Sequence, residues 1–236
     1  MFPTPRTLLV TETFGPTFQG EGPSMGQPAL FVRLSRCNLR CPACDEPRTW
    51  DTTRFDLREH TRRIDVSTLV TWALSHSTPL VVITGGEPLL QQHTLAPFID
   101  ALLKAGRRVE IETNGTITPD AVLVAQAGVR FNVSPKLPGF AADGDTSLVP
   151  EALDALAAAD SICKFVIGAH APDLAFAAAE QIVARHRFAQ VWVMPEGTSS
   201  IQITRGLREM AQAALDREWC LSNRLHVQLW ENASGR

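Results

Sequence analysis

Two kinds of segment are missing from this chain of 236 residues: a run of about 18 apolar residues and a cluster of basic residues. A membrane-spanning helix needs about 20 mainly apolar residues, so the first absence argues against a membrane protein. The second absence, with a formal net charge of −3 and a pI near 6.1, argues against binding to nucleic acid. The first residues also lack the apolar core of a signal peptide. We therefore expect a cytoplasmic protein that contacts neither membrane nor nucleic acid.

Cysteine is scarce as well, and its distribution is uneven. The chain has five cysteines, and three of them, Cys37, Cys41 and Cys44, lie within eight positions. This C-x3-C-x2-C loop supplies three ligands, whereas a structural zinc site needs four. A 4Fe–4S cluster held by three cysteines keeps one iron open, and that iron can bind a small molecule directly. Two interpretations stay open at this point: such a cluster, or a zinc loop completed by Cys163, Cys220 or a histidine.

Short β-branched runs alternate with segments in which apolar residues recur at i, i+3 and i+4, and this alternation is typical of repeated βα units. The predicted strands cover 29–34, 80–83, 108–112, 129–133, 162–167, 191–194 and 225–229. The predicted helices cover 66–74, 95–103, 150–159, 172–185 and 207–215. No linker divides the chain, so we expect a single α/β domain over residues 1–236, built as an open sheet or as a closed or partial barrel.

Polar or glycine-rich segments follow five of the predicted strands directly. These segments are 36–45, 84–88, 113–115, 134–136 and 195–197. Parallel strands bring their carboxyl ends to one rim, where α/β barrels place their chemistry. A turn or a solvated loop end explains each segment alone, but five on one rim predict a functional site. The longest irregular stretches, 45–63 and 137–147, are expected to be active-site or surface loops.

The segment Thr84-Gly85-Gly86-Glu87-Pro88 is the most specific of the five. A pair of glycines is ordinarily a turn former. Here the glycines would also let the backbone approach a ligand closely, and the carboxylate that follows them suits an amine. With the cysteine loop on the same rim, a binding role is favoured over a simple turn.

Seven segments of the chain form a further pattern: FGPTFQGEG, FVRLSRCNLRCPACD, TGGEPLLQQ, ETNGT, NVSPKL, VMPEGT and LHVQLW. Together they resemble the 7-carboxy-7-deazaguanine synthase family of radical S-adenosylmethionine (SAM) enzymes. The resemblance runs from about Thr11 to Trp230, and the order and spacing of the segments carry it. It implies a shortened, modified (β/α) partial barrel and a homodimer. It also implies conversion of 6-carboxy-5,6,7,8-tetrahydropterin to 7-carboxy-7-deazaguanine with loss of ammonia, on the route to queuosine and other deazaguanines.

The resemblance assigns cofactors and site residues too. A 4Fe–4S cluster on Cys37, Cys41 and Cys44, reduced by a donor such as flavodoxin or ferredoxin, would cleave SAM to a radical that takes a hydrogen atom from the pterin. The residues implied to contact SAM are Ala43, Cys44, Asp45, Gly86, Glu87, Thr113, Ser134, Pro135 and Lys136. Those implied to hold the pterin are Phe18, Gln19, Gly20, Arg33 and Thr84. Arg33 and Thr84 are the implied catalytic residues, and the planar fork of Arg33 suits the substrate carboxylate.

Three residues of the cysteine loop depart from the family. Glu46 stands where the family usually has a threonine that reaches Mg²⁺, and Ala43 and Arg48 replace ring-bearing side chains. A carboxylate is a good ligand for a hard cation, so Glu46 is expected either to keep the Mg²⁺ site or to turn away from it. Two alternative functions therefore remain: a radical SAM enzyme with another substrate, and a noncatalytic metal-binding protein. His226 also resembles a family position, but a satisfied core or interface histidine is the simpler interpretation.

Overall fold

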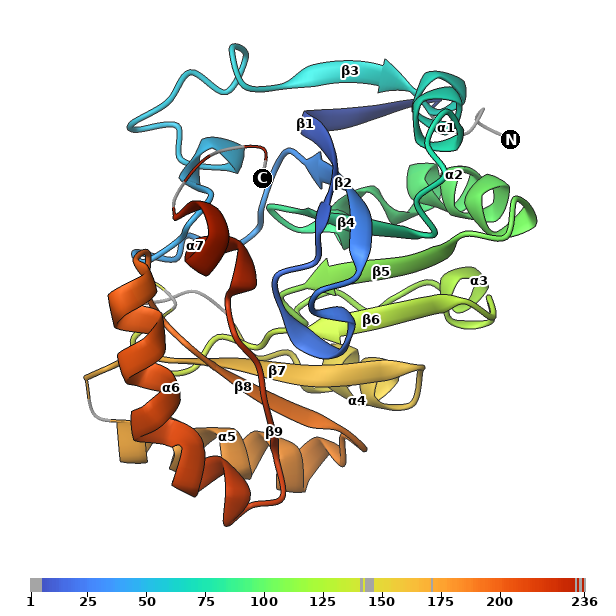
Figure 1. The fold of residues 1–236 in the computed structure, drawn as a ribbon. Coiled ribbons are helices and arrows are strands. Elements are labelled where there is room, and N and C mark those ends of the chain that lie inside the picture. Colours follow the sequence, from blue (N-terminus) through green and yellow to red (C-terminus); the bar gives the residue numbers. More distant parts are fainter. Residues whose placement is uncertain are drawn as a thin grey trace.

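One sheet organises the computed structural model of the chain, which describes residues 6–140, 142, 147–170, 172–231, 233 and 235. Its strands lie in the order β3 (Arg62–Asp65), β1 (Thr7–Phe18), β2 (Pro28–Leu34), β4 (Leu80–Gly85), β5 (Arg108–Thr113), β6 (Val129–Val133), β7 (Ser161–Ile167), β8 (Val191–Pro195) and β9 (Cys220–Leu221). From β2 to β9 all neighbours are parallel, whereas β1 pairs antiparallel with β2 and β3. The edge strands β3 and β9 do not pair, so the expected partial barrel is confirmed as an open one (Figure 1).

Helices fill most connections between the parallel strands. They are α1 (Val66–Leu74), α2 (Gln92–Lys104), α3 (Ala121–Val124), α4 (Pro150–Ala157), α5 (Pro172–His186) and α6 (Ser200–Leu215), followed by α7 (Leu225–Trp230) after the last strand. The apolar stripe of α2, which includes Leu95, Phe98 and Leu102, is fully buried. A capping box of Ser199 and Gln202 begins α6. Among the described helices, none is both long and apolar enough to cross a bilayer.

The hydrophobic core explains why the parallel strands are nearly continuous apolar runs. In β4, Leu80, Val81, Val82 and Ile83 are all 0% exposed, because the sheet is covered on both faces there. The main cluster of buried side chains joins β1, β2 and β4 to β8 with helices α1, α2, α4, α5 and α6. This core fixes the strands in parallel register, and so it brings the segments that follow them to one rim.

Most predicted elements are confirmed, and the exceptions are the last predicted strand and several elements that were not predicted. The predicted strand at 225–229 is wrong, because these residues form α7; a short alternation of apolar and polar residues fits either period. The strand β1 was not predicted, since Gly15 and Pro16 suggest a turn. A register shift between Phe14 and Thr17 lets the strand continue past them as an irregularity. The short elements β3, β9 and α3 were also missed, and the predicted loop at 137–147 lies partly outside the described residues.

Candidate active site

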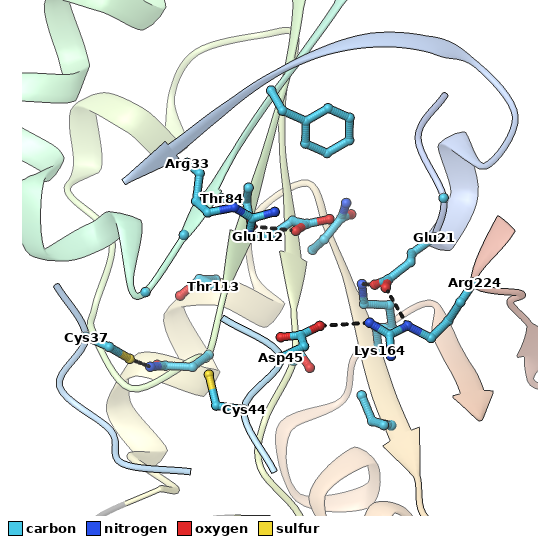
Figure 2. Close-up of a pocket in the computed structure, with 18 of the residues that line it drawn as sticks. Glu21, Arg33, Cys37, Cys44, Asp45, Thr84, Glu112, Thr113, Lys164 and Arg224 are labelled. Carbon is cyan, nitrogen blue, oxygen red and sulfur yellow. Dashed lines mark hydrogen bonds and ion pairs between the residues drawn. The ribbon is translucent and has the colours of Figure 1, made fainter. Parts of the chain in front are cut away.

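A cavity lies at the carboxyl ends of the parallel strands, beside the loop that follows β2 (Figure 2). The sequence-predicted residues that line it are Phe18, Gln19, Gly20, Arg33, Cys37, Cys41, Cys44, Asp45, Thr84, Gly86, Thr113, Ser134 and Lys136. Four predicted residues are not among its described lining: Ala43, Glu46, Glu87 and Pro135. The structure therefore brings most of both predicted sets, for SAM and for the pterin, to a single cavity.

The three cysteines of the loop 37–44 border the cavity together. Burial raises the pKa of the Cys37 thiol to about 11, and it raises the pKa of Cys44 as well. The Cys37 sulfur accepts a hydrogen bond from the Leu39 amide at 3.4 Å. Within the described part of the chain, no three cysteine, histidine or acidic side chains form a preformed group for one metal ion. A tetrahedral zinc site needs four ligands on one ion, whereas three thiolates can hold a 4Fe–4S cluster, so the number of cysteines at the cavity suits the cluster.

Gly85, the last residue of β4, and Gly86 let this segment pack against the cysteine loop. A Cβ atom on Gly86 would lie 2.0 Å from the Arg36 carbonyl oxygen and 2.9 Å from the Cys37 Cβ atom. Gly85 has a φ of 138°, and its Cβ would lie 2.1 Å from the Leu34 carbonyl oxygen. Side chains other than glycine would therefore push the β4 loop away from the cysteines.

Glu87 lies beneath the cavity and contacts other parts of the site. It is 0% exposed, and its carboxylate accepts hydrogen bonds from the Leu89 amide at 2.9 Å, the Thr113 hydroxyl at 2.9 Å and the Asn114 amide at 2.7 Å. Burial raises the pKa of this carboxyl group. In this structure Glu87 thus positions the loop after β5, and Thr113 rather than Glu87 faces the cavity.

A row of hydrogen bonds joins the predicted pterin side to strand β5. The Thr84 hydroxyl donates to Glu112 Oε2 at 2.7 Å, and Gln19 Nε2 donates to Glu112 Oε1 at 3.3 Å. The same Gln19 nitrogen lies 3.4 Å from Glu110 Oε2, and Asn132 Nδ2 donates to that oxygen at 3.0 Å. Glu112 and Asn132 both line the cavity. Carboxylate and amide groups in this arrangement suit a ligand rich in N–H donors.

Arg33 and Glu46 belong to a group of four charged side chains. Arg33 Nε donates to Glu12 Oε1 at 2.8 Å and lies 3.7 Å from Glu46 Oε1. Arg48 Nη2 donates to both Glu46 oxygens, at 3.1 and 3.0 Å. The guanidinium carbon of Arg33 also lies 5.8 Å from the centre of the Phe14 ring. Arg33 faces the cavity from this group, whereas the Glu46 carboxylate is neutralised within it.

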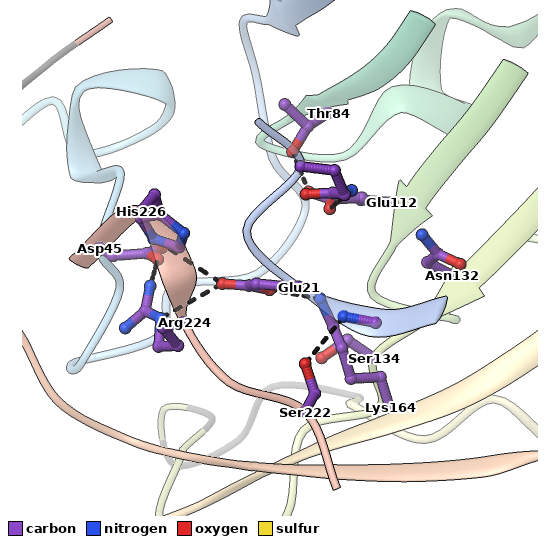
Figure 3. A network of polar contacts seen from close by, with 12 residues as sticks. Glu21, Asp45, Thr84, Glu112, Asn132, Ser134, Lys164, Ser222, Arg224 and His226 are labelled. Atoms are coloured by element: carbon purple, nitrogen blue, oxygen red, sulfur yellow. Dashed lines mark hydrogen bonds and ion pairs between the residues drawn. The ribbon is translucent and has the colours of Figure 1, made fainter. Parts of the chain in front are cut away.

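A second charged group closes another side of the cavity (Figure 3). Glu21 forms ion pairs with Lys164 and, at 3.2 Å, with Arg224 Nε. Arg224 Nη2 reaches Asp45 Oδ2 at 2.7 Å. Burial alone would raise the pKa of Glu21, but Lys164 and Arg224 hold it well below its usual range. Burial lowers the pKa of His226, whose Nε2 lies 4.0 Å from Glu21 Oε1.

Only some residues of this second charged group are recognisable from the sequence. Lys164 interrupts the apolar strand β7 between Cys163 and Phe165, and a lysine at such a position is a recognisable signal that was missed. Nothing near Arg224 distinguishes it from a surface arginine. His226, interpreted from sequence as a satisfied histidine, lines the cavity.

Comparisons with known proteins point to one family. The chain matches the Radical SAM superfamily over residues 32–192. It is 35% identical to a 7-carboxy-7-deazaguanine synthase of Hyperthermus butylicus over 93% of this chain and 92% of that one. The corresponding protein of Pyrobaculum aerophilum is 31% identical over 100% of both chains. The crystal structure of QueE from Escherichia coli has a TM-score of 0.72 and 26% identity, covering 93% of this chain and 95% of the other.

Proposed function

The chain belongs to the 7-carboxy-7-deazaguanine synthase family of the radical SAM superfamily, and from this premise we propose that it converts 6-carboxy-5,6,7,8-tetrahydropterin to 7-carboxy-7-deazaguanine with loss of ammonia. The observation that carries the proposal is the single cavity that joins the three cysteines to the polar ends of the parallel strands. A radical reaction needs both ligands side by side and shielded from water, and one shared cavity meets that need.

The cysteine end of the cavity is the proposed cofactor side. Cys37, Cys41 and Cys44 would hold a 4Fe–4S cluster, and the half-buried thiols and the glycine-packed loop beside them fit such a group. When bound, the cluster and SAM supply the one-electron chemistry. The residues proposed to contact SAM from the cavity wall are Asp45, Gly86, Thr113, Ser134 and Lys136. Glu87 would act through Thr113, whose hydroxyl it holds at 2.9 Å.

The other side of the cavity is the proposed substrate side. Arg33 offers a cation for the pterin carboxylate, and Glu12 at 2.8 Å holds its guanidinium in place. Gln19 and Thr84 are fixed on Glu112, so all three groups present defined hydrogen-bonding atoms. Phe18 and Gly20 complete this side, and the aromatic ring can pack on a flat heterocycle. Preorganised polar groups of this kind orient a ligand at little entropic cost.

Mg²⁺ fits this chain poorly at the position that the family resemblance suggests. Both Glu46 oxygens accept hydrogen bonds from Arg48, and Arg33 lies 3.7 Å away. A divalent cation at this carboxylate would have to displace one arginine and approach the other. We therefore infer that Glu46 has turned away from the metal position and that the reaction in this chain does not depend on a Mg²⁺ ion held by Glu46.

The remaining proposals concern the protein's surroundings. We propose that the chain works in the cytoplasm as a homodimer, with a one-electron donor such as flavodoxin or ferredoxin, and without nucleic acid or membrane as partner. The family resemblance supports the dimer and the donor. The formal net charge of −3 supports the absence of a polynucleotide partner.

Anaerobic reconstitution tests the proposal in two steps. Iron counting and an absorption spectrum first distinguish an iron–sulfur cluster from zinc. The reconstituted protein is then incubated with SAM, a reductant and the carboxypterin, and products are identified by mass spectrometry. We expect 7-carboxy-7-deazaguanine. SAM cleavage without this product would favour a radical SAM enzyme with another substrate, and zinc without iron would favour a noncatalytic metal-binding protein.

A further inference from the structure

The segment Ser222–His226 follows β9, includes the first two residues of α7 and packs against the loop of Gly20, Glu21 and Gly22, here called the substrate loop. The Gly22 amide donates to Ser222 Oγ at 2.8 Å, and the Leu225 amide donates to the Gly20 carbonyl at 2.9 Å. Ser222 is 0% exposed. The loop held in this way is the continuation of the proposed substrate side at Phe18, Gln19 and Gly20. Its position therefore depends on a segment about 200 residues away in the sequence.

Arg224, in the same segment, also contacts the cofactor side of the cavity. Its guanidinium donates to three acceptors on three different segments: Glu21 Oε1 at 3.2 Å, the Gly197 carbonyl at 2.9 Å and Asp45 Oδ2 at 2.7 Å. Asp45 directly follows Cys44, the last cysteine of the loop. One buried side chain thus contacts both the substrate loop and the cysteine loop (Figure 3).

The charges around Arg224 explain why its ion pair with Asp45 stabilises the site. Glu21 is one buried carboxylate that faces two buried cations, because the side chains of Lys164 and Arg224 are 5% and 9% exposed. Glu112 adds a further negative charge near Lys164, and Asp45, whose own side chain is 63% exposed, pairs directly with Arg224. A buried cation without a counter-charge is costly, so docking of Asp45 on Arg224 stabilises the arrangement in which both loops close on the cavity.

We propose that Arg224 is a positioning residue that couples the two ligand sites, so that binding of the pterin favours binding of SAM and the reverse. The proposal rests on the proposed function, which places SAM beside Asp45 and the pterin beside Gly20. Arg224 transmits the effect because neither loop can move away without losing a bond to the same guanidinium. Coupling of this kind is reciprocal by thermodynamic necessity.

Calorimetry on the anaerobic, cluster-loaded protein without reductant measures the coupling, since no turnover occurs. The SAM dissociation constant is determined with and without saturating carboxypterin, and the ratio of the two is the coupling factor. We expect a factor of about ten in the parent, within the common range for coupled sites. Arg224→Gln should bring it close to one. Asp45→Asn should also bring the coupling factor close to one. Because the Asp45 side chain is 63% exposed, this change should leave the fold intact.

Arg217→Gln is the matched control. Arg217 also donates to a carboxylate, Glu180 at 2.7 Å, and to a backbone carbonyl, that of Ala213 at 2.9 Å, but it does not line the cavity. It should keep the parent coupling factor. The double variant Arg224→Gln/Asp45→Asn should lose no more coupling than either single variant, because both remove the same contact. If Arg224 had only a structural role, its substitution would lower stability but would leave the coupling factor as in the parent.

Two results would overturn the inference: a parent coupling factor near one, or an unchanged factor in Asp45→Asn and Arg224→Gln. Either can occur in a protein that forms 7-carboxy-7-deazaguanine normally, and the proposed function would then stand. A parent that binds neither SAM nor the carboxypterin would instead refute the proposed function itself.

Discussion

The backbone of Gly20 lies so close to the imidazole of His226 that a Cβ atom on Gly20 would stand 2.0 Å from His226 Nδ1. The next ring atoms would be 2.9 and 3.1 Å away. Glycine is therefore required at position 20 by a neighbour from the far end of the chain, not by a turn of its own. The contact makes the shape of the substrate loop depend on where α7 begins.

Gly20→Ala tests this dependence. The added methyl group must displace His226 and the start of α7, so we expect stability to fall by about 1–3 kcal/mol. The carboxypterin should bind about tenfold more weakly, a loss of roughly 1.4 kcal/mol, because the substrate loop shifts. Calorimetry and urea unfolding measure the two effects. His226→Ala on the same background should recover much of the lost stability, and a double variant no better than Gly20→Ala would show that the methyl group clashes elsewhere.

The cysteines give a second prediction. Cys37→Ala, Cys41→Ala and Cys44→Ala should each lose the iron–sulfur absorption and all SAM cleavage, because two thiolates hold a cubane poorly. Cys163→Ala and Cys220→Ala serve as controls. Cys163 is 0% exposed in the core and Cys220 is exposed, and neither lines the cavity. Both controls should keep iron content and SAM cleavage; a loss of iron in either one would refute the three-cysteine assignment.

Features encoded by a short stretch of sequence could be predicted, whereas contacts between distant stretches could not. The cysteine loop and the segment Gly85-Gly86-Glu87 are short motifs after recognisable strands, so their common rim was predictable from the parallel topology. The inward orientation of Glu87 was not, because its burial depends on how Thr113 packs over it. The pair of Glu21 and Arg224 joins positions 203 residues apart, and no local pattern encodes such a contact.

The same limit applies to Glu46. Its chemistry suggested a metal ligand from the sequence, and the structure adds what the sequence could not show, namely that Arg48 occupies both carboxylate oxygens. The role of a carboxylate depends on the cation nearest to it. Glu46 and Arg48 are two positions apart, and the sequence does not show whether their side chains turn toward each other.

Arg48 therefore provides a third prediction. Activity of the parent should be unchanged by a chelator that removes Mg²⁺, since Arg48 neutralises Glu46. Arg48→Gln should free this carboxylate and create Mn²⁺ binding, detectable by electron paramagnetic resonance titration. Adding Glu46→Gln to that variant should abolish the new binding. A parent that loses activity on chelation and regains it with Mg²⁺ would contradict the inference that Glu46 has left the metal position.

The last prediction concerns the pH dependence of stability that Glu21 contributes. Lys164 and Arg224 hold its folded-state pKa well below 4.5, its ordinary value, despite the opposing effect of burial. Below about pH 4.5 the unfolded chain binds a proton at Glu21 and the folded protein does not. The contribution is therefore complete at pH 7 and is lost as the pH falls from about 5 toward the folded pKa.

Glu21→Gln removes this contribution and takes away the carboxylate that the buried cations Lys164 and Arg224 share, so it should cost about 3–5 kcal/mol of unfolding free energy at pH 7. The difference from the parent should shrink below pH 4.5, by up to about 1.4 kcal/mol per pH unit, because only the parent loses stability through this group. Urea unfolding of the cluster-free, reduced protein at pH 7, 5, 4 and 3 measures it. Glu180→Gln, at a carboxylate 48% exposed beside Arg217, is the control and should cost little at any pH. A difference between parent and Glu21→Gln that stays constant down to pH 3 would mean that Lys164 and Arg224 do not stabilise the ionised form of Glu21.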